Sequence, residues 1–355
     1  MKNRYIVDHL SAASLRREVS AALPRLLPSC TVLRTYPRAS SQALAADVLL
    51  PSALRRRLRL DVTPEPTPSR IREPLRRLKA SLKGSGAEYP MLASRFLSPR
   101  VRAICREEGV GYLDLAGNCF LSLGGVHVEK IVEHNPFPRR GRPASLFAPV
   151  SSRVARALLE EPKREWTVSA LAESTGMSLG QASNVARRLL DEEYLDKADR
   201  RLRLRDASRL LEAWRDAYTP ALHASHGGYS LERDPQQRLA SVAEAAAARR
   251  LPYAVTSFAA ASLVAPFVHG VSTLVWYVER PEAIEAWTRA LDLRPVDEGA
   301  NVILLVPNDP GVFHRSRTVN GVSLVGDVQL YLDLYADAGR GREQAEFLRQ
   351  QRLRW

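Results

Sequence analysis

Helix-start and helix-stop signals follow one another at short intervals in the middle of the chain, and they limit its fold more than any other feature. Residues 151–160 form an amphipathic helical pattern that Pro162 ends. Thr167 is suited to cap a second helix, and Gly176 is suited to stop it in a left-handed conformation. Ser178 can cap a third helix directly afterwards. The sequence therefore predicts three short helices with a tight turn between the second and the third.

The third predicted helix, residues 179–192, separates apolar from polar side chains. Its inward stripe consists of Ala182, Val185, Ala186, Leu189 and Leu190. Its outward side chains are Gln181, Asn184, Arg187 and Arg188. Asn and Gln can form two hydrogen bonds with adenine, Arg can bind guanine or phosphate, and a helix N-terminus attracts phosphate. We therefore expect Ser178, at the start of the helix, and the four outward residues to contact DNA.

Residues 196–205 alternate leucine with arginine, which is typical of a short β-hairpin with one buried face. Leu202 and Leu204 would close the small core, and the basic residues would lie beside the DNA backbone or the minor groove. The hairpin residues that we expect to contact DNA are Lys197, Arg200, Arg201 and Arg203. A linker rich in Pro and Gly would add phosphate contacts through Arg139, Arg140 and Arg142.

From Trp166 to Leu189 the chain has the pattern Trp-Thr-Val-x-x-Leu-Ala-x-x-x-Gly-x-Ser-x-x-x-x-x-x-Val-x-x-x-Leu. Together with the hairpin, this pattern resembles the winged helix-turn-helix superfamily. The resemblance implies binding to double-stranded DNA, with the third helix in the groove. Some winged helices mediate protein contacts instead, and the outward Arg, Asn and Gln residues favour DNA.

Two stretches, 134–145 and 219–237, are rich in Pro, Gly and polar residues, which is typical of linkers between segments. The segments on either side of the central one alternate strand-like and helical patterns. The sequence thus predicts a mixed α/β protein of several domains, in which a central winged helix-turn-helix at 139–216 lies between α/β domains at 1–138 and 217–355.

The order of these parts resembles the transcriptional regulators of the AbiEi type, which are bacterial antitoxins of type IV toxin-antitoxin systems. The residues that carry this resemblance are the winged helix, the run Leu251-Pro-Tyr-Ala-Val-Thr-Ser-Phe-Ala-Ala-Ala-Ser-Leu, and the segments that begin at Asp327 and Gly341. The resemblance implies a repressor or antitoxin that regulates its own expression, with a toxin or effector as protein partner, and no catalysis. A homodimer is compatible with it.

The first segment is faintly similar to the PD-(D/E)XK nuclease fold, in which acidic residues on neighbouring strands hold a divalent metal and a lysine helps to activate water. Asp47 and Asp61 stand where such acids would lie, but Thr63 occupies the position of the lysine. We therefore expect no enzyme, and a degenerate nuclease fold reused to hold DNA. A metal-dependent DNA nuclease is the alternative.

Asp114 and Asn118 interrupt an apolar strand pair in the same segment. A hairpin in which these two side chains are hydrogen-bonded explains them more simply than a functional site.

The formal net charge of +13 favours a polyanionic partner, although a GC-rich genome would also enrich Arg. Cys30, Cys105 and Cys119 are too far apart in the sequence to suggest a zinc site or a disulfide framework. The common nucleotide, metalloprotease and hydrolase motifs are not found, so we expect no cofactor and no metal. No apolar stretch reaches membrane-spanning length, and we expect a cytoplasmic protein.

Overall fold

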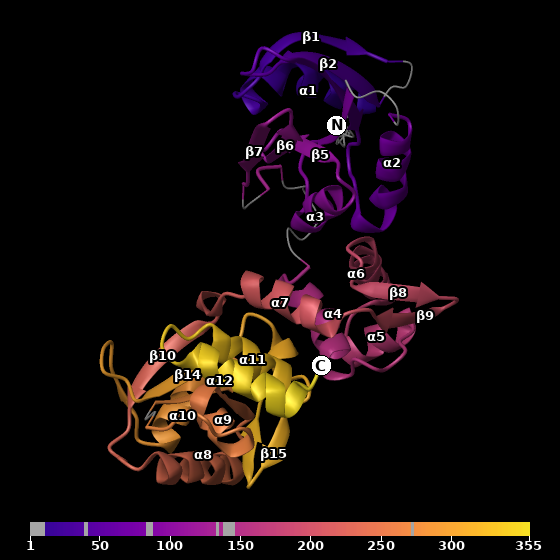
Figure 1. The fold of residues 1–355 in the computed structure, drawn as a ribbon. Helices are drawn as coiled ribbons and strands as arrows, with labels where there is room; N and C mark the ends of the chain where they lie inside the picture. Colours follow the sequence, from indigo (N-terminus) through magenta and orange to yellow (C-terminus); the bar gives the residue numbers. More distant parts are fainter. Residues whose placement is uncertain (1–10, 39–41, 83–87, 133–134, 138–145, 271–272) are drawn as a thin grey trace, which may run out of the picture. The chain divides into compact units, whose positions relative to one another are not determined.

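The computed structural model describes residues 11–38, 42–82, 88–132, 135–137, 146–270 and 273–355. The chain divides into two compact units, residues 1–144 with 191–193, and residues 145–190 with 194–355 (Figure 1). Both units combine helices and β-sheet. The mixed α/β fold that the sequence predicts is therefore confirmed.

The first unit is built on a seven-stranded sheet in which the strands lie in sequence order. The strands are β1 (Thr31–Pro37), β2 (Ala43–Leu49), β3 (Arg55–Val62), β4 (Glu88–Ser94), β5 (Gly111–Asp114), β6 (Cys119–Leu123) and β7 (Val126–Lys130). The pairs β3–β4 and β4–β5 are parallel, because α2 (Pro68–Ala80) and α3 (Pro99–Glu107) connect them. The other neighbouring strands are antiparallel.

The sheet of the first unit contributes to two apolar cores. Helix α1 (Ala12–Leu26) packs its buried residues against the inward residues of β2, β3 and β4. Helices α2 and α3 form the second core with β4 and β5. In β3, the buried residues Leu58, Leu60 and Val62 alternate with the charged residues Arg57, Arg59 and Asp61, which explains why one face of this strand joins the first core.

The turn between β5 and β6 is held by a buried polar cluster. The Asp114 carboxylate is fully buried and accepts hydrogen bonds from the backbone N–H groups of Leu97 (2.9 Å), Gly117 (3.0 Å) and Asn118 (3.0 Å). The Asn118 amide donates to the same carboxylate (2.7 Å), and its carbonyl oxygen accepts from Arg102 (2.6 Å). Because these groups satisfy one another, Asp114 and Asn118 form the hydrogen-bonded hairpin that the sequence favours.

The second unit begins with three helices, a hairpin and a fourth helix. They are α4 (Pro149–Glu160), α5 (Val168–Thr175), α6 (Leu179–Asp191), β8 (Leu195–Ala198), β9 (Arg201–Leu204) and α7 (Ala207–Ala217). Three 3₁₀- or π-helical segments occur later, η1 (Pro220–Leu222), η2 (Pro310–Phe313) and η3 (Arg349–Leu353).

A mixed sheet of seven strands follows, in the order β13-β10-β14-β12-β11-β16-β15. Its strands are β10 (Ala224–Tyr229), β11 (Tyr253–Thr256), β12 (Leu274–Val278), β13 (Arg294–Pro295), β14 (Val302–Val306), β15 (Arg317–Val319) and β16 (Val322–Leu324). The accompanying helices are α8 (Pro235–Arg249), α9 (Ser257–Val264), α10 (Ala283–Ala290), α11 (Asp327–Tyr335) and α12 (Gly341–Leu348). One apolar core contains residues of α4 to α7 and of this sheet, so these elements fold as one unit.

The stretch 219–237, expected as a linker, contains the strand β10, which pairs with β13 and β14. Gly227 permits this pairing because a Cβ there would lie 2.8 Å from the carbonyl oxygen of Val296. A glycine that looks like a loop signal in the sequence here serves the close approach of two backbone segments.

Candidate nucleic-acid interface

Helix α6 carries the side chains that the sequence predicts to contact DNA. Its inward residues Ala182, Val185, Ala186 and Leu189 are all at most 6% exposed. Gln181, Asn184 and Arg187 are exposed, as their positions in the pattern predict, whereas Arg188 is half-buried. The helix therefore presents a polar face whose orientation is set by its packed apolar face.

The N-terminal turn of α6 is closed by two residues that bond each other. The Ser178 hydroxyl accepts a hydrogen bond from the Gln181 N–H (3.3 Å), and the Gln181 side-chain oxygen accepts from the Ser178 N–H (3.1 Å). This reciprocal arrangement is a capping box. One turn further on, the Arg187 guanidinium donates to the Asn184 side-chain oxygen (2.8 Å), so these two exposed side chains are held side by side.

The turn before α6 follows the signals in the sequence. The Thr167 hydroxyl accepts from the Ala170 N–H (3.1 Å) and caps α5. Gly176 adopts the left-handed conformation with φ 63° and ends α5, where its N–H reaches the carbonyl of Ala172. Met177 is buried directly after it, which anchors the turn between α5 and α6 in the core.

The hairpin β8–β9 packs on the helices through Leu202, which is 2% exposed. Trp166 extends the hairpin, because its N–H donates to the Leu202 carbonyl (2.9 Å) and its carbonyl accepts from the Leu202 N–H (2.7 Å). Lys197, Arg200 and Arg201 are exposed on this hairpin.

Two hairpin arginines form ion pairs within the unit. Arg203 pairs with Glu165, and Arg205 pairs with Asp196. The sequence pattern did not reveal the first of these pairs, since Glu165 lies 38 residues from Arg203 along the chain. Arg139, Arg140 and Arg142, the predicted linker contacts, lie outside the described residues.

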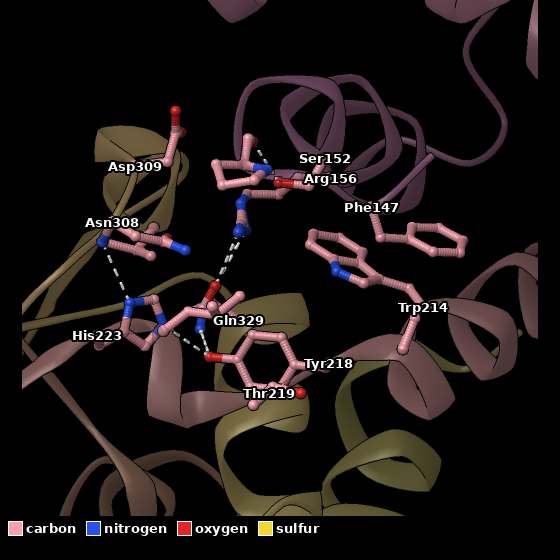
Figure 2. A pocket seen from close by; sticks show the side chains of 14 residues that line it. Phe147, Ser152, Arg156, Trp214, Tyr218, Thr219, His223, Asn308, Asp309 and Gln329 are labelled. Carbon is pink, nitrogen blue, oxygen red and sulfur yellow. Dashed lines mark hydrogen bonds between the residues drawn. The ribbon is translucent and has the colours of Figure 1, made fainter. Parts of the chain in front are cut away.

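Buried polar contacts join α4 to the C-terminal part of the second unit. Arg156 is 3% exposed and donates to the side-chain oxygen of Gln329 in α11 from both terminal nitrogens (3.1 and 2.8 Å). The Gln329 amide in turn donates to Asp333 (2.7 Å), so one glutamine connects the buried guanidinium of Arg156 with the half-buried carboxyl group of Asp333. Figure 2 shows Arg156 and Gln329 facing each other beside Trp214. Arg153 adds an ion pair with Asp309 (2.7 Å).

These contacts border a small cavity of about 40 Å³, lined by polar and aromatic residues. Its lining includes Arg156, Trp214, Tyr218, His223 and Gln329. The Tyr218 hydroxyl lies 3.1 Å from the His223 ring nitrogen, and burial lowers the pKa of His223, which favours the neutral imidazole. The cavity has room for a few water molecules, and all of its lining residues belong to the second unit.

The two acids considered for a nuclease site do not face each other. Asp47 pairs in register with Arg57, and Asp61 pairs with Ala43, which is four positions away along β2 and corresponds to roughly 13 Å. Asp47 accepts hydrogen bonds from Arg57 (2.8 Å) and Arg34 (3.1 Å), and the bond from Arg57 lowers its pKa. Among the described residues, no group of three or more His, Cys, Asp or Glu side chains is placed to hold a metal ion.

Residues 203–354 match the family model described as "Transcriptional regulator, AbiEi antitoxin, Type IV TA system". The predicted resemblance to AbiEi regulators is thereby confirmed for this part of the chain. The match begins in β9 and does not include α6 or the capped turn. Comparisons with curated proteins and with solved structures give no significant match. None of the described helices is long and apolar enough to cross a membrane.

Proposed function

We propose that this protein is a transcriptional regulator that binds double-stranded DNA in a sequence-specific manner through a winged helix-turn-helix formed by α4, α5, α6 and the hairpin β8–β9. The observation that carries the proposal is the exposed pair Asn184 and Arg187, held together on α6 above a buried apolar stripe. Asn suits adenine and Arg suits guanine in the major groove. A helix with one packed face and one polar face can present both to the base edges.

The match to AbiEi antitoxins supports the biological role. A regulator of this kind would repress its own promoter and act in the cytoplasm, where its DNA is. A toxin would be its protein partner, and the matched segment 203–354 is the part of the chain to which we assign that contact.

The test is a competition gel shift that compares DNA from the region upstream of the protein's own gene with random duplex. Asn184→Ala or Arg187→Ala should lower the preference for the specific sequence by about 1–3 kcal/mol and leave binding to random duplex unchanged, because base contacts specify and phosphate contacts position. Arg289→Ala, on the exposed face of α10, is the control and should leave both unchanged. Circular dichroism checks that each variant is folded. Folded variants with the full sequence preference would show that α6 does not read DNA.

A metal-dependent nuclease is the alternative proposal. Incubation of supercoiled DNA with the protein and Mg²⁺, with Asp61→Ala as control, distinguishes it from a regulator. Cutting that depends on Asp61 would support the nuclease.

A further inference from the structure

The excess positive charge of the chain is confined to its first 144 residues. This segment contains 25 Lys and Arg residues against 12 Asp and Glu residues, whereas residues 145–355 contain 27 of each kind. Even the stretch 145–216, with α4 to α7 and the hairpin, is nearly balanced, at 13 basic against 12 acidic residues. The electrostatic attraction to a polyanion therefore comes from the segment 1–144.

A high arginine content of the genome does not explain this division. Arginine is used at similar levels in both segments, with 21 residues among the first 144 and 25 among the following 211. The segments differ in their acidic residues, which offset the arginines only after residue 144. A bias in the genome would act on both segments alike.

Helix α2 carries several exposed basic side chains. Arg70, Arg76 and Arg77 expose 80%, 62% and 73% of their side chains. Lys79 is also exposed, and Glu73 is the one acidic residue within the helix. Arg70 and Arg77 are seven residues apart, which is close to two helical turns and places them on the same side of α2.

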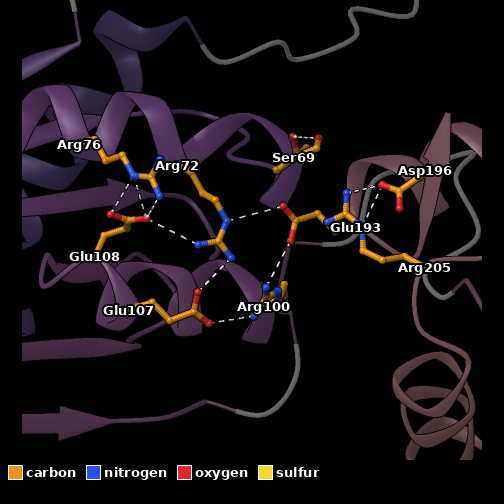
Figure 3. Close-up of polar contacts among 10 residues, drawn as sticks. Ser69, Arg72, Arg76, Arg100, Glu107, Glu108, Glu193, Asp196 and Arg205 are labelled. Carbon is orange, nitrogen blue, oxygen red and sulfur yellow. Dashed lines mark hydrogen bonds and ion pairs between the residues drawn. The ribbon is translucent and has the colours of Figure 1, made fainter. Parts of the chain in front are cut away.

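The other basic residues of α2 contact the C-terminal end of α3 and fix the position of the helix. Arg72 pairs with Glu107 (2.9 Å) and Arg76 with Glu108 (3.1 Å), both acids being near the C-terminal end of α3. Lys79 donates to the carbonyl of Glu108 (2.8 Å). Figure 3 shows Arg72 and Arg76 directed toward these acids. These contacts hold α2 in a fixed position relative to α3.

We propose that the exposed side of α2 that carries Arg70 and Arg77 binds the phosphate backbone of duplex DNA. This side would supply non-specific affinity to the protein. This inference rests on the proposed function for its choice of polyanion. Phosphate contacts made by arginine suit a helix that carries no large apolar side chain on its exposed face, since Ile71 and Leu75 are buried. A helix that binds an anionic membrane would instead insert such side chains.

The experiment measures the affinity of the full-length protein for random duplex as a function of salt. Each phosphate contact contributes about one to the slope of log affinity against log salt, so the double variant Arg70→Gln, Arg77→Gln should have a slope that is shallower by about two. Glu73→Gln removes the one acid of the helix and should strengthen binding.

The matched control is the double variant Arg289→Gln, Arg340→Gln, which makes the same charge change in the second unit. Arg289 is as exposed as Arg77 and also pairs with a glutamate four residues away. The slope of log affinity against log salt for this control variant should equal that of the unmodified protein. An equal decrease of the slope in both double variants would overturn the proposal, because the change in net charge alone would then explain the decrease. An unchanged slope in the α2 variant, or α2-dependent binding to phosphatidylserine vesicles without an effect on DNA, would also overturn it.

The two proposals fail in different ways. If α6 does not read sequence, the Asn184 and Arg187 variants keep their preference while the α2 variant still loses salt dependence. If α2 does not contact DNA, sequence preference still depends on α6 and the α2 variant behaves like its control.

Discussion

Glu160, the last residue of α4, caps another helix. Its carboxylate accepts a hydrogen bond from the Val328 N–H (3.1 Å) in the first turn of α11. The N-cap residue of α11 is Gly326, which has no side chain for this purpose, and a Cβ there would lie 2.6 Å from a carboxylate oxygen of Glu160. Burial raises the pKa of Glu160 to about 7, which favours the protonated form. This contact is therefore sensitive to pH near neutrality.

Glu160 should make the second unit less stable as the pH rises from about 4.5 to about 7. The folded protein holds the proton up to pH 7 while the unfolded chain releases it near the ordinary glutamate value, so the unfolded state gains stability over this range. Glu160→Gln stays uncharged and can still accept from Val328. Urea unfolding at pH 5 and pH 8 should show that the unmodified protein loses about 2–3 kcal/mol relative to this variant. An equal pH dependence in both proteins would contradict the assignment.

At the scale of elements, α4 connects the proposed DNA-reading helices with the segment that resembles AbiEi antitoxins. Its residues Arg153, Arg156 and Glu160 follow one another at helical spacing and contact η2 and α11. Arg156 is also stacked over the Trp214 ring of α7, 4.8 Å from its centroid. A change in the position of α11 would therefore act directly on α4.

Gln329→Met should destabilise the second unit by about 3 kcal/mol, because it leaves the buried Arg156 guanidinium without its hydrogen-bond acceptor. The double variant Arg156→Met, Gln329→Met should lose less than the two single variants together, since it also removes the buried charge. A double-mutant cycle by chemical unfolding measures this difference. If the losses in the free energy of unfolding were additive, the two residues would stabilise the unit independently.

At the scale of the whole molecule, the two units have separate apolar cores. Leu23 of α1 lies in a core of the first unit, and Leu158 of α4 lies in the core of the second, both 0% exposed. We therefore expect each unit to unfold in a cooperative transition of its own.

Calorimetry of the full chain should therefore show two transitions. Leu23→Ala should lower the temperature of one transition and Leu158→Ala that of the other, each with a loss of about 2–5 kcal/mol from the cavity it creates. The variants serve as controls for each other. A single transition that shifts with both variants would mean that the units unfold together.

The local part of the candidate site could be predicted from the sequence. The caps at Thr167 and Ser178, the stop at Gly176 and the buried stripe of α6 depend on residues within a turn or two of one another, so spacing and residue type were sufficient. The exposure of Asn184 and Arg187 followed from the same periodicity.

Only the tertiary structure decided which distant side chains meet. The pairing of Arg203 with Glu165, the half-burial of Arg188 and the bond from Arg156 to Gln329, 173 residues away, depend on how whole elements pack. The strand β10 likewise exists because β13 and β14 accept its backbone, in a stretch whose own residues favour a loop. Such contacts are selected by the shape and polarity of a completed core, and a pattern with a period of a few residues carries no information about them.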